Sequence, residues 1–424
     1  MEKLIIEPYR NNTGYVVKFV SLKNRLILSK VIKIFSRLIR EEKKYMTLDF
    51  RNCKPPSFPN IICSISGLVD MYRHEYNLKV KMLITDNSYL DNTRLQSPYS
   101  FVKDEGLLKD DIFDKVIKFS DDKDVSNISE NILHQLQTHV VCEDGILVAS
   151  SWCLNEIMDN VLNHSESLSG YIMVQIHKKN KHLVFSIFDN GKGLYNSLKY
   201  TKYRPKTTID AIKLAVKEGV TRDKELGQGN GMWGLHNIIE ENGGILTIAS
   251  GSAAMIFDYN SQDTKVFRNL PYASKIYNTT LVDFMVDFSK MLNVKKALKN
   301  YEPFEYISRE LEKMETDYGK IVFLVKEHTI GTGTRSAGRK VRNALINIQK
   351  MDNKLILIDF NGISLGTSSY ADEFIGKLSV IYGLDKFLMN FKIINCTQLM
   401  LDLINKAIEQ RQKEHIVDNK TVIN

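Results

Sequence analysis

The chain contains 424 residues, of which 43% are hydrophobic, and its formal net charge is +8 at pH 7. This composition supplies several packed cores and excludes a largely disordered chain. The mild positive charge permits a nucleotide or acidic partner but gives no clear sign of nucleic-acid binding.

No apolar run reaches the roughly 18 residues that a membrane span needs, and the N-terminus lacks a signal-peptide pattern. Five cysteines occur without a Cys-x-x-Cys pair. This pattern argues against a disulfide framework or a structural zinc site. We therefore expect a cytoplasmic protein, and at about 150 residues per domain its length predicts two or three domains.

The first predicted domain covers residues 1–120. Residues 24–44 place apolar side chains at helical spacing between lysines and arginines, which predicts an amphipathic helix. A strand at 45–50, a helix at about 60–76 and a strand at 78–85 follow. The basic helix could lie on a membrane surface, but we favour packing against its own sheet with the lysines outward.

The second predicted domain covers residues 140–288. It begins with a helix at 145–163 and two strands, 171–177 and 182–188, joined by a polar turn. The further expected elements are helices near 209–218 and 234–242 and strands near 245–249, 255–259 and 280–288. This order predicts helices grouped against an antiparallel sheet.

The third predicted domain covers residues 320–412 and alternates strands with helices, which predicts a small α/β sandwich. Its strands are expected at 321–325, 355–360 and 391–395, and its helices at 337–351 and 371–382. The polar tail after Arg411 is expected to fray. The first and third domains share a strand end with an acidic-aromatic pair, Asp49-Phe50 and Asp359-Phe360. A duplicated fold and a chance match are equally consistent with so short a repeat.

Three clusters in the second domain carry the chemistry. In the first, Glu156, Asn160 and Asn163 repeat at i, i+4 and i+7, so they share one helical face. Such a carboxylate could orient water, and an amide oxygen is a ligand that Mg²⁺ accepts alongside phosphates. The alternative is an ordinary solvated face.

The second cluster follows a predicted strand, where Asp189 precedes Gly191 and Gly193. A buried carboxylate there could accept a hydrogen bond from the exocyclic amine of adenine, and the glycines would let the backbone approach a flat ligand. A simple turn is the alternative.

The third cluster is glycine-rich and opens a helix, where free N–H groups form an anion site suited to a triphosphate. Its glycines are Gly227, Gly229 and Gly231. Each cluster alone is weak, but the three in this order predict a site for ATP and Mg²⁺.

On these motifs, residues 142–288 resemble the GHKL ATPase superfamily of gyrase, heat-shock chaperones and histidine kinases, which uses the Bergerat fold. The resemblance implies that Asn160 binds Mg²⁺, Glu156 activates water or a hydroxyl, and Asp189 binds adenine. It implies that Asn163 and the glycines named above contact the nucleotide, under a lid at 195–226. His134 and His139 lack the context of a phospho-acceptor, so a histidine autokinase is disfavoured.

The third domain, through Ile358-Asp359-Phe360 and the segment 367–378, resembles a STAS-like domain of unknown function; the first domain resembles a more degenerate STAS-like fold. The predicted fold class is therefore α/β and α+β multidomain, with a central Bergerat-fold α/β sandwich between two small STAS-like α/β domains. Resemblance to anti-sigma-factor antagonists implies phospho-acceptors at Ser368 and Ser369. Capping of the following helix is the favoured alternative.

The leading hypothesis is a bacterial signalling or defence regulator in which nucleotide state controls the contacts of the STAS-like domains. The alternatives are a serine kinase acting on a STAS-like domain and a non-catalytic, ATP-dependent scaffold. Analogy with the superfamily suggests a homodimer, and a protein encoded nearby is the expected protein partner.

Overall fold

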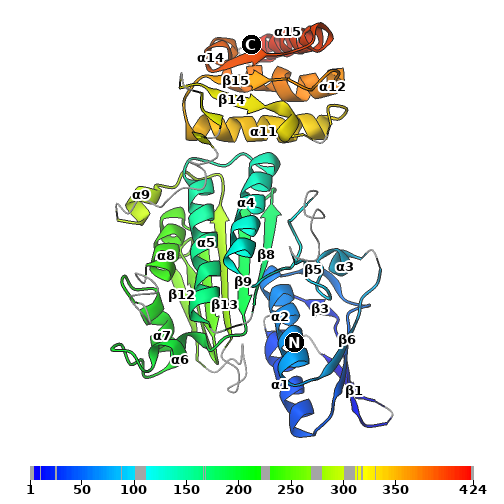
Figure 1. Ribbon diagram of the computed structural model, residues 1–424, viewed down its shortest axis with the longest axis vertical. Coiled ribbons are helices and arrows are strands. Elements are labelled where there is room, and N and C mark those ends of the chain that lie inside the picture. Colours follow the sequence, from blue (N-terminus) through cyan, green and yellow to red (C-terminus); the bar gives the residue numbers. More distant parts are fainter. Residues whose placement is uncertain are drawn as a thin grey trace. The chain divides into compact units, whose positions relative to one another are not determined.

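The computed structural model describes most of the chain, and its residues form two compact units (Figure 1). The described residues are 4–9, 11–23, 26–86, 88–100, 111–165, 167, 169–220, 230–268, 279–299, 311, 312, 314–316, 319–329 and 331–421. The first unit takes those within 1–132, 152–287 and 293–302, and the second takes those within 133–151, 288–292 and 303–424. The predicted division into three domains stays a prediction.

A four-stranded sheet begins the first unit, in the order β1-β2-β4-β6. Its strands are β1 (Ile5–Pro8), β2 (Gly14–Lys18), β4 (Tyr45–Asp49) and β6 (Lys79–Leu83), and its helices are α1 (Leu26–Arg40) and α2 (Pro59–Glu75). Because β2, β4 and β6 are parallel and consecutive in the sheet, right-handed crossovers carry both helices to one face. Alternate strand residues such as Val17, Leu48 and Met82 are buried in one core with both helices.

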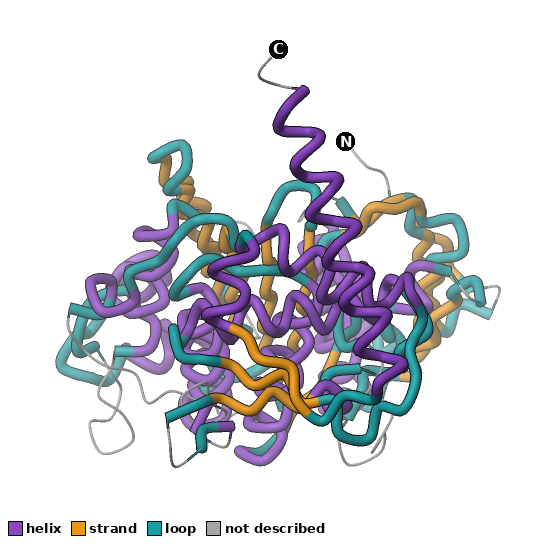
Figure 2. Tube along the Cα trace, turned by 90° about the horizontal axis from the view of Figure 1, so that it is seen from above, coloured by secondary structure: helices purple, strands orange, loops and turns teal. Residues whose placement is uncertain are grey.

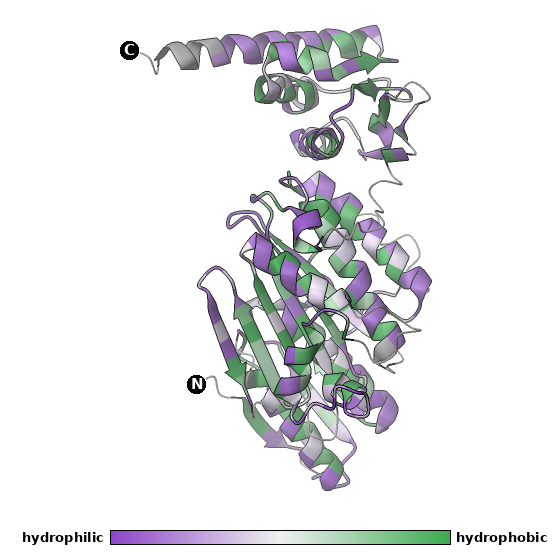
Figure 3. Ribbon diagram, turned by 90° about the vertical axis from the view of Figure 1, so that its left-hand side faces the viewer, coloured by the Kyte–Doolittle hydropathy of each residue, from purple (hydrophilic) through white to green (hydrophobic). Residues whose placement is uncertain are grey.

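A seven-stranded antiparallel sheet forms the rest of the first unit, in the order β12-β11-β10-β13-β9-β8-β7. Its strands are β7 (Ile117–Phe119), β8 (Gly170–His177), β9 (His182–Asp189), β10 (Ile245–Ser250), β11 (Ala253–Asp258), β12 (Asp263–Phe267) and β13 (Thr280–Asp287). The strands are predominantly apolar (Figure 3). Helices α5 (Ile146–His164) and α8 (Gly231–Asn242) lie across one face (Figure 1).

Helix α2 covers the other face of this sheet. A Cβ added to Gly67 would lie 2.4 Å from the ring of Phe188 and 2.9 Å from that of Tyr171, so the helix backbone touches the sheet side chains. Beside this contact, Asp70 accepts hydrogen bonds from the Tyr171 hydroxyl and, at 2.6 Å, from Lys118 Nζ. The four-stranded domain is therefore fixed to the seven-stranded sheet by close packing at Gly67 and by the hydrogen bonds of Asp70.

The second unit contains a three-stranded parallel sheet, β14 (Ile321–Leu324), β15 (Ile356–Asp359) and β16 (Phe391–Ile394), in that order. Its helices are α11 (Arg335–Met351), α12 (Ser368–Ala371), a π-helical turn (Asp372–Gly376), α13 (Lys377–Tyr382), α14 (Leu384–Asn390) and α15 (Gln398–Thr421). Phe323, Ile358 and Phe374 are fully buried in its core.

Most of the expected helices and strands are confirmed, but several observed elements were not predicted, among them β1, β2, β7 and β12, and one expectation was wrong. The tail after Arg411 does not fray, because α15 continues as one helix to Thr421 (Figure 2). Its apolar side buries Met400, Ile404 and Ala407. Helix α4 (Asp122–His139) was missed altogether.

The structure gives the suspected duplication a common topology, since β2-α1-β4-α2-β6 and β14-α11-β15-α12/α13-β16 have the same order. In both, the side chain of the aspartate that ends the middle strand accepts a hydrogen bond from the backbone N–H of the residue two positions later. The phenylalanine between these two residues donates its own N–H to the last carbonyl of the third strand. The four pairs are Asp49–Arg51 (3.1 Å), Asp359–Asn361 (2.8 Å), Phe50–Leu83 (2.8 Å) and Phe360–Ile394 (3.1 Å). The repeated sequence phrase thus has one local structure.

All five cysteines are free thiols. Within the part of the chain that the structure describes, no helix is both long and apolar enough to span a lipid bilayer.

The packing of α2 predicts the effect of Gly67→Ala. A helical Gly→Ala change alone would gain about 1 kcal/mol in propensity. Overpacking against Phe188 and Tyr171 costs about 1–3 kcal/mol, so the free energy of unfolding should fall on balance. Urea denaturation measures this change. Gly331→Ala, where the added Cβ meets open space, is the control, and an undiminished midpoint for Gly67→Ala would contradict the packing described.

Candidate functional site

Two of the predicted clusters meet where α8 begins beside α5. A Cβ added to Gly231, the first residue of α8, would lie 2.5 Å from Glu156 Oε2 and 3.0 Å from Asn160 Nδ2. Glu156 and Asn160 are partly buried. The carboxylate and the amide therefore lie directly against the backbone of the glycine-rich turn, and only a residue without a side chain leaves them this position.

Burial changes the acidity of Glu156. Desolvation raises the pKa of this carboxyl above its ordinary value, and the nearby charge of Asp159 raises the pKa further. A carboxylate with a raised pKa is a better proton acceptor near neutral pH. The side chain thus has the position and the basicity to orient a water molecule or a hydroxyl.

Asp189 lies at the end of β9 and is 6% exposed. Burial raises its pKa to about 7, against the opposing effect of hydrogen bonds from the Gly191 backbone and from Thr280. The Gly191 N–H donates to Asp189 Oδ1 at 2.8 Å. A carboxylate has about four acceptor sites, so beside the donors of Gly191 and Thr280 it can still accept a hydrogen bond from a ligand amine.

The loop after Asp189 is held tightly against the end of α5. A Cβ on Gly191 would lie 2.2 Å from the Ser165 carbonyl oxygen, and the same oxygen accepts the Lys192 N–H at 2.7 Å. Gly193 has a φ of 72°, the left-handed region that favours glycine. These glycines therefore permit a close turn that brings Asp189 and the α5 helix to one end of the sheet.

The segment predicted as a lid, 195–226, is described up to residue 220. It contains most of α6 (Gly193–Leu198) and all of α7 (Thr208–Ala215), which packs on β10 and β11. The Tyr203 hydroxyl donates to the Gly219 carbonyl at 2.8 Å, and the Gly219 N–H donates to Asn230 Oδ1 at 3.3 Å. The described part of the segment is thereby tied to the residue that precedes α8.

The structure brings together some predicted residues and not others. Glu156, Asn160 and Gly231 are in contact, whereas the side chain of Asn163 is exposed. Gly227 and Gly229 lie outside the described residues. Across the described ranges, no three His, Cys, Asp or Glu side chains gather as a metal site.

Sequence reasoning missed a contact that fixes α8 against α5. A Cβ on Gly234 would lie 2.1 Å from Cη2 of Trp152, so the tryptophan ring packs on the bare helix backbone. Trp152 lies one turn before Glu156 on α5. The predicted helix began at residue 234, whereas α8 begins at Gly231. A glycine within a helix costs about 1 kcal/mol relative to alanine and so indicates a packing reason, but the predicted start concealed this signal.

In the second unit, Thr367 caps α12, since its Oγ1 accepts the Tyr370 N–H at 3.1 Å. Ser368 is exposed and Ser369 is partly buried. Thr367 therefore has the capping role predicted for this segment. The hydroxyls of Ser368 and Ser369, the two candidate phospho-acceptors, do not cap the helix.

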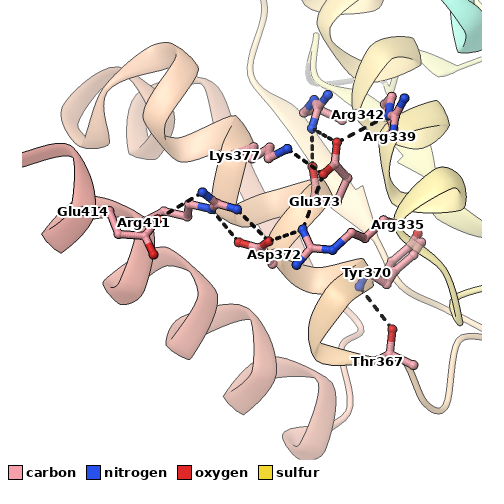
Figure 4. Close-up of polar contacts among 10 residues, drawn as sticks. All are labelled: Arg335, Arg339, Arg342, Thr367, Tyr370, Asp372, Glu373, Lys377, Arg411 and Glu414. Carbon is pink, nitrogen blue, oxygen red and sulfur yellow. Dashed lines mark hydrogen bonds and ion pairs between the residues drawn. The ribbon is translucent and has the colours of Figure 1, made fainter. Parts of the chain in front are cut away.

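Charged side chains surround the π-helical turn that follows α12 (Figure 4). Asp372 Oδ2 accepts from Arg335 at 2.8 Å and from Arg411 Nη2 at 2.9 Å, while Arg411 Nε donates to Oδ1 at 2.6 Å. The hydrogen bonds from Arg411 lower the pKa of Asp372. This cluster fixes α15 to the π-helical turn at the point where the polar tail begins.

In the second unit, residues 337–399 match the family described as a STAS-like domain of unknown function. The match runs from α11 into α15, so the C-terminal part of the chain contains a STAS-like domain. No curated protein matches the chain.

The raised pKa of Asp189 predicts a pH dependence of stability. Folding disfavours the ionised form, so this group's contribution is fully present below its ordinary pKa of 3.8 and is lost as pH rises through about 7. Asp189→Asn lacks this titration. The stability of Asp189→Asn relative to wild type should therefore increase by up to roughly 4 kcal/mol between pH 4 and pH 8. Urea denaturation at several pH values measures it, and a constant difference would contradict the burial of the carboxyl.

Proposed function

We propose that the central part of the chain is a GHKL-type ATP- and Mg²⁺-binding domain. The observation that carries the proposal is the contact of the Gly231 backbone with Glu156 and Asn160. A carboxylate, an amide oxygen and free helix N–H groups at one place suit a water molecule, a hard cation and phosphate oxygens respectively.

The surrounding architecture supports the same proposal. The seven-stranded sheet is antiparallel, and helices α5 and α8 cover one face of it. This arrangement suits a Bergerat-type α/β sandwich. The four-stranded domain shares its topology with the C-terminal STAS-like domain, which supports a STAS-like assignment for the N-terminal part as well.

Each residue has a separate task in the proposed site. Asp189 would accept a hydrogen bond from the adenine amine, with Gly191 and Gly193 beneath the base, and the turn at Gly231 would hold phosphate oxygens. Asn160 would hold Mg²⁺, which when bound offsets phosphate charge. Gly227, Gly229 and Asn163 belong to the proposal through the sequence resemblance.

The proposed reaction is hydrolysis. Glu156 orients a water molecule and accepts its proton as the water oxygen bonds to the γ-phosphorus. The bond from that phosphorus to the β–γ bridging oxygen breaks, and its electron pair stays on ADP. The nucleotide state then controls the contacts of the STAS-like domains, in a bacterial signalling or defence setting with a homodimer or a nearby-encoded protein as the partner.

Calorimetric titration with Mg·ATP and a phosphate-release assay test this function together. Asn160→Ala should weaken Mg·ATP binding by about 1–3 kcal/mol, a factor of roughly 5 to 150. Glu156→Gln should retain binding and reduce turnover by at least about 100-fold, because the proton acceptor is lost.

The matched control is Glu130→Gln, which removes an exposed carboxylate from α4. It should change neither quantity. Binding without turnover in the wild-type protein would favour the scaffold alternative. The absence of Mg·ATP binding by folded wild-type protein would contradict the proposal entirely.

One observation favours serine-kinase activity as a second candidate. Ser368 is exposed, and the cap of α12 is supplied by Thr367. A phosphate at a helix N-terminus is stabilised by the free N–H groups and the helix dipole.

This candidate predicts one phosphate on the C-terminal STAS-like domain after incubation with Mg·ATP, detected by intact mass. Ser368→Ala should lose this phosphate. The control variant Ser336→Ala, at another exposed serine, should keep it. A phosphate retained by Ser368→Ala but lost by Ser369→Ala would move the acceptor by one residue, and an unmodified wild-type chain would reject self-phosphorylation.

A further inference from the structure

Helix α11 of the STAS-like domain holds the turn that precedes α5. Asn347 is 1% exposed and uses all the hydrogen-bonding groups of its amide there. Its Nδ2 donates to the carbonyls of Gln137 and Val140, both at 2.9 Å, and its Oδ1 accepts the Cys142 N–H at 2.9 Å. One side chain thus links the end of α4 to the start of the next segment.

Two neighbours on the same face of α11 extend this contact. Asn343 Nδ2 donates to the Thr138 carbonyl at 3.2 Å, and Lys350 Nζ donates to Glu143 Oε1 at 2.8 Å. The last carbonyls of a helix have no partners within that helix. The asparagines supply the missing donors for α4, so their contacts satisfy buried backbone groups, and the partly exposed Lys350–Glu143 ion pair adds to them. We call Asn343, Asn347 and Lys350 the α11 clamp.

The turn is also held by the segment that follows β13. The Glu143 N–H donates to the Phe288 carbonyl and the Leu292 N–H donates to the Asp144 carbonyl, both at 2.9 Å. All these residues belong to the second compact unit. The start of α5 is therefore fixed on both sides within that unit.

Helix α5 then continues into the first compact unit, which takes the helix from Trp152 onward. Glu156 follows Ile146 by ten residues, about 15 Å along a helix. The contact between Gly231, Glu156 and Asn160 leaves no room for a side chain at Gly231, so a small rotation or shift of α5 changes it. A helix transmits displacement of its first turn to later residues because its backbone hydrogen bonds are continuous.

We propose that Asn347 and Lys350 are positioning residues through which the STAS-like domain sets the Mg²⁺-dependent half of the nucleotide site. The inference rests on the proposed function and names its regulation: an event that withdraws α11 from the turn loosens the start of α5. The adenine half is farther from the clamp, because Asp189 lies on β9 and is held by Gly191 and Thr280, and its loop contacts Ser165, after α5 has ended. The clamp therefore acts mainly on the phosphate and cation contacts, which lie in the middle of α5.

Two measurements on the full chain test the proposal. Hydrogen exchange at the Cys142 amide reports the clamp directly, since that N–H donates to Asn347. Nucleotide Kd values, measured by calorimetry with Mg²⁺ and again with EDTA, report the two halves of the site. The variants are Asn347→Ala and the milder Lys350→Met, which keeps the alkyl stem, and the control is Asn353→Ala at an exposed asparagine near the end of the same helix.

Both clamp variants should speed exchange at Cys142, and both should weaken Mg·ATP binding, by about tenfold for Asn347→Ala and less for Lys350→Met. ATP binding in EDTA should change by less than about twofold, and Asn353→Ala should match wild type throughout. If Asn347→Ala does not fold, Lys350→Met alone decides the outcome.

Faster exchange at Cys142 with an unchanged Mg²⁺ dependence would reduce the clamp to a purely structural role and overturn the proposal. Equal losses of affinity with and without Mg²⁺ would do the same, because they indicate general destabilisation. Wild-type protein that binds no nucleotide would instead remove the proposed function, and the exchange data would then still show whether α11 holds the turn.

Discussion

The close approach of the first turn of α8 to the middle of α5 is the constraint on which the proposed site depends. Gly231 has no Cβ, and Glu156 and Asn160 occupy the space that a Cβ would fill. The second glycine of α8, Gly234, lets Trp152 pack on the same helix. Two helices are thus brought together by glycines one turn apart, and this distance places a carboxylate and an amide beside free N–H groups.

Helices pack on both faces of the seven-stranded sheet. Helices α5 and α8 cover one face of the sheet. Asp189 ends strand β9, and the loop that follows it contacts Ser165 just after α5. The other face carries α2, where Asn60 donates to the buried carboxylate of Asp283 at 3.1 Å beside Ser186. Buried polar groups need such partners, so this pair fixes the register of α2 on the sheet as well as contributing to its packing.

The sequence predicted long periodic elements well, because α1, α5 and α11 each carry an apolar stripe that local spacing reveals. It predicted that Asp189, Glu156 and the glycines belong to one site only through their order in the chain. The contact of Gly231 with Asn160 joins residues about 70 positions apart, and no local pattern specifies such a distance. The helical tail was missed for the same reason, since Arg411 finds Asp372 only after the C-terminal domain has folded.

The most direct measurement is the affinity of Gly231→Ala for Mg·ATP. The neighbouring atoms are the flexible ends of Glu156 and Asn160, so the variant should fold with an unchanged unfolding midpoint while both side chains are displaced. We predict that Mg·ATP binding falls by at least about tenfold, roughly 1.4 kcal/mol, with Gly333→Ala as the control in open space. Wild-type affinity in a folded Gly231→Ala protein would contradict the account.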